Sequence, residues 1–426
     1  MIGETVTASH RPRRRLVIVG NGLATDSLIG HLGTDHPWSV RVLGDEPVRH
    51  YNRIMLSPLL GGETDLPSIS PRDESWYRAR RVTVSPGKRV TGIDRRRRRV
   101  LCEDGEWVDY HTLVLATGAR ASLPPLPGVD TLAGVGGFRS LEDARRLRER
   151  CQARPGARAV VVGAGLLGVE AAVGLRRLGA DVTLVHRRPV LMNRQLDASA
   201  SALLLAALSD RGIRVRTGCD PRRLLGATSV TGVEVEEGGV SRTLPADLVV
   251  FATGITPNRE LARAAGLECG AGVRVDAALC TSDPRIRALG ECCEFQGNTY
   301  GLVAPVRAQA EVLARVLRGE TARYRDPAPL TRLKVSGLDI HTLGPVDAAE
   351  GQQTLWLSDA AAGVYKKLIL ENGRLRGVLL VGDVRHSQWY AHALQSGRDL
   401  GALRDILLTH PTRDDAHETG LPVEVA

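Results

Sequence analysis

The sequence has few aromatic residues and no long apolar run. Phe, Trp and Tyr make up 4% of its 426 residues, although hydrophobic residues of all kinds make up 43%. That hydrophobic share excludes an intrinsically disordered chain. The longest purely apolar stretches, such as residues 202–208 and 378–381, are far shorter than the roughly 20 residues of a membrane span. We therefore expect a folded protein of two or three domains that has no membrane partner.

Patterned cysteines are also missing. The seven Cys include no C-x-x-C pair and no zinc or iron–sulfur spacing. This pattern predicts reduced thiols and no metal site. The first residues, "MIGETVTASHRPRRR", are charged but lack the apolar segment of a secretory signal. We expect a frayed basic tail on a cytoplasmic protein.

Positive charge is what the chain has in excess. The net charge is +9, and the densest cluster is "DRRRRRV" at residues 94–100. This cluster is typical of a solvated hairpin turn, or alternatively of a docking patch for an acidic protein, because opposite charges speed encounter. The arginines accompany no nucleic-acid-binding motif and no interleaved aromatics. Nucleic acid is therefore not an expected partner.

A glycine-rich turn follows the first apolar strand, in "LVIVGNGLAT" at residues 16–25. The pattern predicts a strand, a helix and a second strand at residues 15–19, 23–32 and 39–43. Gly20 permits the sharp bend, and Gly22 lets the backbone approach a pyrophosphate at the N-terminus of the helix. Thr25 stands where such turns usually have a third glycine. After the second strand, Asp45 or its neighbour Glu46 lies near the spacing of an acid that binds a ribose.

The same unit recurs at "VVVGAGLLGVE", residues 160–170, with all three glycines present: Gly163, Gly165 and Gly168. A helix follows and is predicted to end at Gly179 as its cap. The strand "DVTLVH" completes the unit. Two such units indicate that one chain binds two dinucleotides.

Three later segments fit this plan. Apolar strands at 113–119 and 248–254 each end in Ala-Thr-Gly, and residues 281–291 predict a strand that ends on a glycine and a carboxylate suited to a ribityl chain. A helix then begins with Pro305 in its first turn, and its N-terminus suits an electron-rich flavin edge. Nearer the C-terminus, Asn372-Gly373 between two apolar strands predicts a type I′ hairpin.

The order of these motifs resembles the two-dinucleotide-binding-domain flavoprotein superfamily over residues 15–317. "YNRIMLSPLLGGE", "LMNRQLD", "GECCEFQGNTYGLVAP" and "YKKLILENGRLRGVLLVGD" resemble the flavin module of assimilatory nitrite reductase large subunits and the electron-transfer flavoproteins of nitrate assimilation. They are more distantly similar to rubredoxin and ferredoxin reductases. The resemblance then extends to about residue 407.

This resemblance implies an α/β fold with two Rossmann-like domains, for FAD and NAD(P), and a small C-terminal α+β domain. The implied FAD domain is discontinuous, at residues 1–119 and 255–324. The NAD(P)H domain would be residues 120–254, and the C-terminal domain residues 325–426. Monomer and homodimer both remain open.

The resemblance also implies site residues. Arg53 falls where related reductases place a cation near the flavin N5, and Glu170 where they place a carboxylate close to flavin and nicotinamide; these are the expected catalytic residues. The expected FAD-binding residues are Gly20, Asn21, Gly22, Leu23, Ala24, Asp45, Arg53, Ser57, Thr117, Gly118, Gly290, Glu291 and Val303. The expected NAD(P)H-binding residues are Gly163, Gly165, Leu167, Gly168, Glu170, His186, Arg187, Arg188, Thr253 and Gly254.

The nicotinamide preference depends on "HRR", His186 to Arg188, where an NAD enzyme usually has an acid. Arginines suit a 2′-phosphate, as in the similar segment of bacterial thioredoxin reductases. The nitrite reductase group, however, often has His here and uses NADH. NADPH is favoured and NADH stays open.

Two departures shape the expected function. The sequence has neither the cysteine sets of the nitrite reductase iron–sulfur and sirohaem domains nor the C-x(4)-C of a redox disulfide. We therefore expect an FAD-dependent NAD(P)H oxidoreductase that passes electrons from its flavin to an acidic partner, either a ferredoxin- or rubredoxin-like carrier or a nitrate or nitrite reductase subunit. The alternatives are an NAD(P)H oxidase that reduces oxygen directly, and a non-enzymatic flavin-binding sensor in which Thr25 crowds the first turn.

Overall fold

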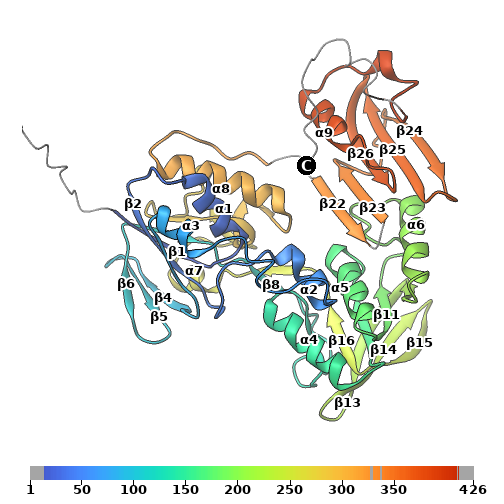
Figure 1. The fold of residues 1–426 in the computed structure, drawn as a ribbon, viewed down its shortest axis with the longest axis horizontal. Coiled ribbons are helices and arrows are strands. Elements are labelled where there is room, and N and C mark those ends of the chain that lie inside the picture. The colour runs from blue at the N-terminus through green and yellow to red at the C-terminus, as the bar shows by residue number, and fades with distance from the viewer. Residues whose placement is uncertain (1–13, 327–329, 336–337, 410, 412–426) are drawn as a thin grey trace, which may run out of the picture. The chain divides into compact units, whose positions relative to one another are not determined.

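The protein is described by a computed structural model that covers residues 14–326, 330–335, 338–409 and 411. Most of the predicted basic tail, residues 1–13, lies outside the described residues. The chain forms two compact units (Figure 1). The first unit contains Met1–Met55, Thr64–Arg120 and Ile255–Pro327, and the second contains Leu56–Glu63, Ala121–Gly254 and Ala328–Ala426. None of the described helices is both long and apolar enough to cross a membrane.

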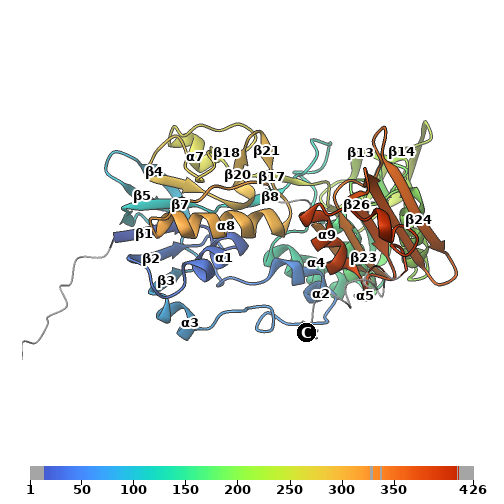
Figure 2. The same ribbon diagram turned by 90° about the horizontal axis from the view of Figure 1, so that it is seen from above.

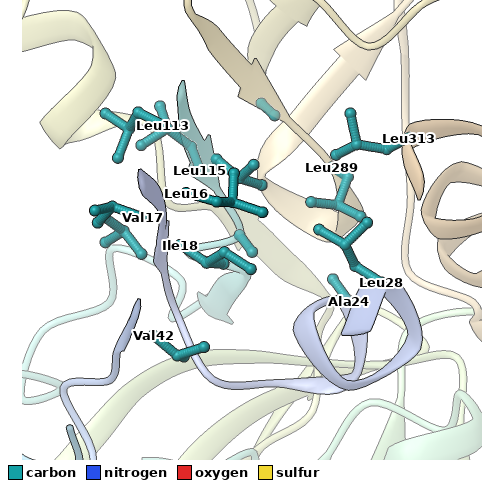
Figure 3. Close-up of a cluster of buried hydrophobic side chains, with 14 of the residues drawn as sticks. Leu16, Val17, Ile18, Ala24, Leu28, Val42, Leu113, Leu115, Leu289 and Leu313 are labelled. Atoms are coloured by element: carbon teal, nitrogen blue, oxygen red, sulfur yellow. The ribbon is translucent and has the colours of Figure 1, made fainter. Parts of the chain in front are cut away.

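A parallel five-stranded sheet forms the centre of the first unit. In spatial order its strands are β19 (Ile286–Ala288), β7 (Thr112–Leu115), β1 (Arg14–Val19), β2 (Trp38–Leu43) and β3 (Val82–Ser85). Helices α1 (Leu23–Leu32) and α8 (Val303–Leu317) pack side by side (Figures 1 and 2). Leu16 and Ile18 of β1 point toward Leu28 of α1 and Leu313 of α8 (Figure 3). Val17 points to the opposite face and is 1% exposed, so β1 is buried on both faces as a parallel central strand should be.

Shorter elements complete the first unit. Two three-stranded sheets and several short helices surround the central sheet. Their bounds are β4 (Val90–Asp94), β5 (Arg99–Cys102), β6 (Trp107–Asp109), β18 (Val273–Val275), β20 (Cys293–Phe295), β21 (Asn298–Thr299), α3 (Glu74–Ala79), α7 (Glu260–Ala264) and the 3₁₀ turns η1 (Arg53–Met55) and η2 (Gly290–Cys292). In addition, β8 (Ala119–Ala121) pairs with β17 (Ile255–Pro257).

The second unit repeats the parallel architecture. Its sheet has the order β12 (Arg214–Thr217), β11 (Asp181–His186), β10 (Arg158–Val162), β16 (Leu248–Phe251) and β9 (Val135–Gly137). Its helices are α2 (Leu56–Leu60), α4 (Leu141–Ala153), α5 (Leu166–Arg177) and α6 (Ala198–Ser209). The antiparallel strands β13 (Cys219–Gly226), β14 (Val230–Glu237) and β15 (Val240–Pro245) form a further small sheet.

The C-terminal part of the second unit is an antiparallel sheet with one packed helix (Figure 1). Its strands, in spatial order, are β22 (Leu330–Val335), β23 (Leu338–Leu343), β26 (Arg374–Val381), β25 (Val364–Glu371) and β24 (Gln353–Asp359). Helix α9 (Ser387–Ser396) packs against β26. A chain reversal at Asn372 and Gly373, with φ values of +49° and +72°, joins β25 to β26. This confirms the predicted type I′ hairpin.

The α/β class and most of the predicted elements are confirmed. The helix at 23–32 and the strand "DVTLVH" have their predicted bounds. The arginine cluster lies at a hairpin, with residues 95–98 as the turn between β4 and β5. The strand predicted for residues 281–291 shrinks to β19. One reason is that Thr281 Oγ1 accepts the N–H of Asp283 at 3.1 Å, which makes the start of that segment a turn.

Candidate functional site

The first glycine turn, between β1 and α1, requires glycine at its start. Gly20 has φ +109°, and a Cβ atom there would lie 2.0 Å from the carbonyl oxygen of Ala116. Gly22 is the N-cap of α1, with φ −96° and no side-chain cap. A Cβ atom on Gly22 would meet no heavy atom within 4 Å. The space beside the N-terminus of α1 is thus open at Gly22, as a pyrophosphate site requires.

Thr25 does not crowd this turn. Its side chain is fully buried, and its hydroxyl donates a 2.7 Å hydrogen bond to the carbonyl oxygen of Gly20. The threonine therefore joins α1 to the turn by a hydrogen bond. At the corresponding position of the second unit, Gly168 packs directly against Gly163. The feature that favoured a non-enzymatic flavin-binding sensor has a structural explanation.

Asn21, between the two glycines, carries unused hydrogen-bonding capacity. Both its amide nitrogen and its amide oxygen are buried and lack a partner among the described residues. Buried polar atoms are rarely left unsatisfied in a folded protein. These orphaned atoms, at the turn expected to hold a dinucleotide, fit a site completed by a bound polar group.

The two candidate ribose carboxylates differ in their surroundings. Glu46 is partly buried, accepts a 2.7 Å hydrogen bond from the hydroxyl of Tyr51 and forms an ion pair with Arg53. Asp45 is exposed, and one of its oxygens accepts the N–H of Glu46 at 3.0 Å. Because Glu46 is engaged by two partners, Asp45 is the better candidate for a ribose hydroxyl pair.

Arg53, expected near the flavin, belongs to a cluster of acidic neighbours. Burial acts to lower its pKa, but the surrounding groups prevail and the pKa is raised; they are Tyr51, Glu46, Glu291 and Asp45. The guanidinium therefore stays charged at every physiological pH. It can stabilise a nearby negative charge but cannot transfer a proton.

The residues around the first Ala-Thr-Gly segment are locked by Asn258. Thr117 Oγ1 donates to the carbonyl oxygen of Asn258 at 2.8 Å, and Asn258 Nδ2 donates to the carbonyl oxygen of Thr117 at 2.8 Å. The N–H of Asn258 also donates to the carbonyl oxygen of Gly118 at 3.0 Å. A Cβ atom on Gly118 would lie 3.9 Å from Glu291 Oε2, so this segment and Glu291 are neighbours.

Gln309 is a residue that sequence reasoning missed. Its side chain is fully buried on α8, and its Oε1 accepts the N–H of Gly290 at 2.7 Å. Gly290 has φ +83°, and a Cβ atom there would lie 2.9 Å from the Cβ atom of Ala24 in α1. A polar residue on the apolar face of α8 was the available signal. Val303, the first residue of α8, follows an N-cap that offers no side-chain hydrogen bond, so the helix N-terminus is open.

The second turn, between β10 and α5, repeats these requirements more strictly. Gly163 has φ +105°, and a Cβ atom there would lie 2.5 Å from the carbonyl oxygen of Ala252. Gly165 is the N-cap of α5, and its Cβ position is open. A Cβ atom on Gly168 would lie 1.8 Å from the carbonyl oxygen of Gly163. Leu167 is in the first turn of α5, and the open position at Gly165 matches the one at Gly22 in the first unit.

The second Ala-Thr-Gly segment is anchored within the same unit. Thr253 Oγ1 donates to the carbonyl oxygen of Ser122 at 2.6 Å, and the N–H of Ser122 donates to the carbonyl oxygen of Gly254 at 2.9 Å. Gly254 has φ +119°, a conformation that favours glycine.

Glu170 and Ser57 meet in the second unit. Ser57, expected among the flavin-binding residues, lies on α2, and its hydroxyl donates to Glu170 Oε2 at 3.4 Å. Burial raises the pKa of Glu170 from 4.5 to about 7, and the hydrogen bond from Ser57 acts in the opposite direction. Glu170 is therefore poised between its protonated and ionised forms at neutral pH.

This raised pKa predicts a pH dependence of stability. Between about pH 4.5 and 7 the folded protein keeps a proton on Glu170 that the unfolded chain has lost, so the stabilisation present below pH 4.5 is lost as the pH rises toward 7. Glu170→Gln should remove this loss. Denaturant unfolding of both proteins at pH 5, 6, 7 and 8 measures it, and the variant should gain on the wild type as pH rises. Parallel stability profiles would contradict the prediction.

His186, Arg187 and Arg188 follow β11. His186 Nδ1 accepts the N–H of Ala164 in the second turn at 3.3 Å. Burial lowers the pKa of His186 and the two arginines add to this, while hydrogen bonding to Asn193 and Val190 opposes it. Arg187 and Arg188 are exposed, and neither has an ion pair or hydrogen-bond partner for its guanidinium among the described residues. The imidazole is thus a neutral part of the turn, and the guanidinium groups are available to an anion.

The expected residues therefore gather in two groups. Those around Gly20, Arg53 and Glu291 lie in the first unit, and those around Gly163 and Glu170 lie in the second, together with Ser57. All seven cysteines, each in the described part of the chain, are free. The only metal-ligating group found among the described residues is Cys102, Asp104 and Glu106, and Lys88 already pairs with both of its carboxylates.

Two family models match this chain. Residues 14–311 match the pyridine nucleotide-disulphide oxidoreductase model, and residues 329–398 match the rubredoxin NAD+ reductase C-terminal domain. The chain belongs to the pyridine nucleotide-disulphide oxidoreductase family. Members of this family bind FAD and NAD(P)H. The open helix N-termini and the orphaned Asn21 amide fit such cofactors.

Individual relatives of this oxidoreductase carry names from electron transfer. It is 36% identical to the assimilatory nitrate reductase electron transfer subunit of Bacillus subtilis (strain 168), covering 96% of this chain and 52% of that protein. It is 34% identical to the ferredoxin–NAD(+) reductase component of the biphenyl dioxygenase system of Paraburkholderia xenovorans (strain LB400). That match covers 79% of this chain and 81% of that protein. Among solved structures, a chain of the covalent putidaredoxin reductase–putidaredoxin complex superposes on this chain with a TM-score of 0.81 and 28% identity. The match covers 96% of this chain and 100% of that chain. The oxidoreductase spans about half the length of the nitrate and nitrite reductase relatives that it matches.

Proposed function

We propose that this chain is an FAD-dependent NAD(P)H:acceptor oxidoreductase that passes electrons from reduced nicotinamide, by way of FAD, to a separate redox partner. The observation that carries the proposal is the pair of open dinucleotide turns in one chain whose seven cysteines are all free. The names of the relatives support an electron-transfer role. A bound flavin accepts hydride from a nicotinamide and can release the electrons one at a time.

The protein's own contribution is binding and electrostatics. Gly22 and the N-terminus of α1 would hold the flavin pyrophosphate, Asp45 a ribose, and Glu291 the ribityl chain. In the second unit, Gly165 and the N-terminus of α5 would hold the nicotinamide pyrophosphate. Arg53 keeps a permanent positive charge for the flavin, and Glu170 supplies a carboxyl group that changes its protonation near neutral pH.

The nicotinamide is proposed to be NADPH. Arg187 and Arg188 are exposed, and their guanidinium groups have no partner among the described residues, at the strand end where a 2′-phosphate is bound in such units. No acid stands in "HRR" to bind a 2′-hydroxyl.

One kinetic experiment tests the function and the nicotinamide preference together. The FAD-loaded protein is mixed anaerobically with NADPH or NADH, and the flavin absorbance is followed by stopped flow. We expect rapid bleaching, faster with NADPH, and then steady-state reduction of ferredoxin, rubredoxin and ferricyanide. A flavin that neither nucleotide bleaches would remove the proposal. Oxygen consumption as fast as carrier reduction would instead favour an NAD(P)H oxidase.

The partner is proposed to be acidic and to dock at the arginine turn between β4 and β5. Arg95 is paired with Asp283 at 2.8 Å, and Arg99 lies over the ring of Trp107 at 4.0 Å. Arg96 and Arg98 are exposed, and their guanidinium groups have no ion pair or hydrogen bond among the described residues. The charge available to an acidic carrier is therefore concentrated at these two positions.

Reversing these two charges should slow protein carriers selectively. Arg96→Glu/Arg98→Glu is expected to reduce the rate with ferredoxin or rubredoxin by about tenfold or more at low ionic strength, because steering by opposite charge is lost. Ferricyanide reduction should change little. The matched control is Arg145→Glu/Arg148→Glu, the same charge change at exposed positions of α4. Equal slowing by both double variants would dismiss the docking site.

A further inference from the structure

The segment "LMNRQLD", residues 191–197, lies between β11 and α6. At one end it contacts the second glycine turn, between β10 and α5. The N–H of Met192 donates to the carbonyl oxygen of Ala164 at 2.8 Å. Ala164 is the residue between Gly163 and Gly165, and its own N–H donates to His186 Nδ1. Hydrogen bonds therefore hold Ala164 on two sides, and one of them comes from the 191–197 segment.

At its other end the segment is held by the C-terminal sheet. Asp197 is the N-cap of α6 and accepts the N–H of Ala200 at 3.0 Å. The same carboxylate accepts the hydroxyl of Tyr365 at 2.8 Å and the ammonium of Lys367 at 2.9 Å. Both members of the Lys367–Asp197 ion pair have side chains that are 13% exposed. Strand β25 therefore binds the segment through a largely buried ion pair.

A second strand adds to this attachment. Thr342 Oγ1 on β23 donates to the carbonyl oxygen of Gln195 at 3.1 Å. The C-terminal sheet thus binds the segment at two neighbouring points: the side chain of Asp197 and the backbone carbonyl of Gln195.

Hydrogen bonds and one left-handed residue connect the two ends of the segment. Met192 has φ +47° with its side chain 1% exposed, a conformation that a non-glycine residue keeps only where its surroundings fix it. Its carbonyl oxygen accepts the N–H groups of Gln195 and Leu196 at 2.7 and 3.0 Å. The N–H of Leu191 donates to Ser201 Oγ of α6 at 2.9 Å. A displacement of Asp197 is therefore transmitted to Met192 and onward to Ala164.

We propose that Asp197, Tyr365 and Lys367 are positioning residues for the nicotinamide nucleotide, which hold the pyrophosphate-binding turn in place through residues 191–197. The proposal rests on the proposed function, because it assigns a nucleotide to the second turn. It gives the C-terminal sheet a role in nucleotide affinity. By thermodynamic linkage, a bound nucleotide must stabilise the attachment of β25 by the same factor.

The test compares two lysines on one strand. Lys367→Met breaks the ion pair with Asp197. The control Lys366→Met breaks another largely buried ion pair, between Lys366 Nζ and a carboxylate oxygen of Asp383 at 2.8 Å, which does not involve the segment. FAD-loaded proteins are titrated with NADP+ and NAD+ by calorimetry. We expect Lys367→Met to raise the nucleotide Kd by about fivefold or more, and to raise KM while kcat at saturation stays near the wild-type value. Lys366→Met should lower thermal stability but keep the wild-type Kd.

The outcomes separate cleanly. Equal nucleotide Kd values for the two lysine variants would overturn the inference. Wild-type protein that binds neither nucleotide would overturn the proposed function instead. Should Lys367→Met not fold, Tyr365→Phe decides, because it removes one hydrogen bond and keeps the ion pair: a raised Kd supports the inference, and an unchanged one overturns it.

Discussion

Gly22→Ala should bind FAD about 10- to 100-fold more weakly than the wild type while remaining folded. A Cβ atom at this position meets no atom of the protein within 4 Å, and φ is −96°, which alanine adopts freely. The added methyl would occupy the space in front of α1 that a pyrophosphate needs. Overpacking of this kind costs about 1–3 kcal/mol, and each 1.4 kcal/mol is about tenfold in affinity. Fluorescence titration of the apoprotein with FAD measures the change.

The neighbouring glycine gives the contrast. Gly20→Ala places its Cβ atom 2.0 Å from the carbonyl oxygen of Ala116 at a φ of +109°, so it should unfold the first unit rather than merely weaken binding. Thermal melting of the two apoproteins separates these effects. A Gly22→Ala protein with unchanged FAD affinity would mean that the first turn does not hold the pyrophosphate.

Gly168→Ala should destabilise the second unit by about 3 kcal/mol or more. The new Cβ atom would lie 1.8 Å from the carbonyl oxygen of Gly163 and 2.9 Å from its carbonyl carbon, so α5 must move away from the turn. Backbone shifts forced by overpacking reach about 3 kcal/mol and occasionally exceed it. Denaturant unfolding followed by circular dichroism measures the loss.

Gly165→Ala in the same turn is the matched control for this stability measurement. Its Cβ position is open and its φ is −81°, so its free energy of unfolding should stay near that of the wild type. Similar losses for the two variants would show that the close approach of α5 to Gly163 is not what makes position 168 intolerant of a side chain.

The parts of the fold that sequence predicted well are those specified by neighbouring residues. The strand, turn and helix around Gly20 need only apolar runs and two glycines, and the hairpin at Asn372 needs only a turn dipeptide. Both are confirmed within a residue or so. The positive φ values of Gly20, Asn372 and Gly373 follow from these local requirements.

What sequence could not predict depends on partners far along the chain. Ser57 meets Glu170 across 113 positions, and Arg95 meets Asp283 across 188. Such contacts are set by how the sheets close, and no local pattern encodes them. Ion pairs therefore neutralise part of the charge that the arginine cluster shows in the sequence. No local pattern placed Ser57 in the second unit, and its assignment as a flavin-binding residue stays a prediction.

The threonine at position 25 shows a third kind of limit. The motif predicted glycine, and its absence suggested crowding. Instead, the hydroxyl of Thr25 donates to the carbonyl oxygen of Gly20 and joins the helix to the turn by a hydrogen bond. A glycine motif describes only one way to pack a helix against its turn, and this structure uses a hydrogen-bonding side chain instead.

Helix α2 is synthesised before the elements that it packs against. Residues 56–63 belong to the second unit, and Leu60 lies against Gly174 of α5, with 3.1 Å between its Cδ2 and the Cβ position of that glycine. During synthesis this short helix cannot pack against α5 until more than a hundred later residues have left the ribosome. A fragment that begins at residue 121 would lack this helix and would leave the apolar flank of α5 uncovered. The excised second unit should therefore aggregate unless residues 56–63 are supplied as a separate peptide.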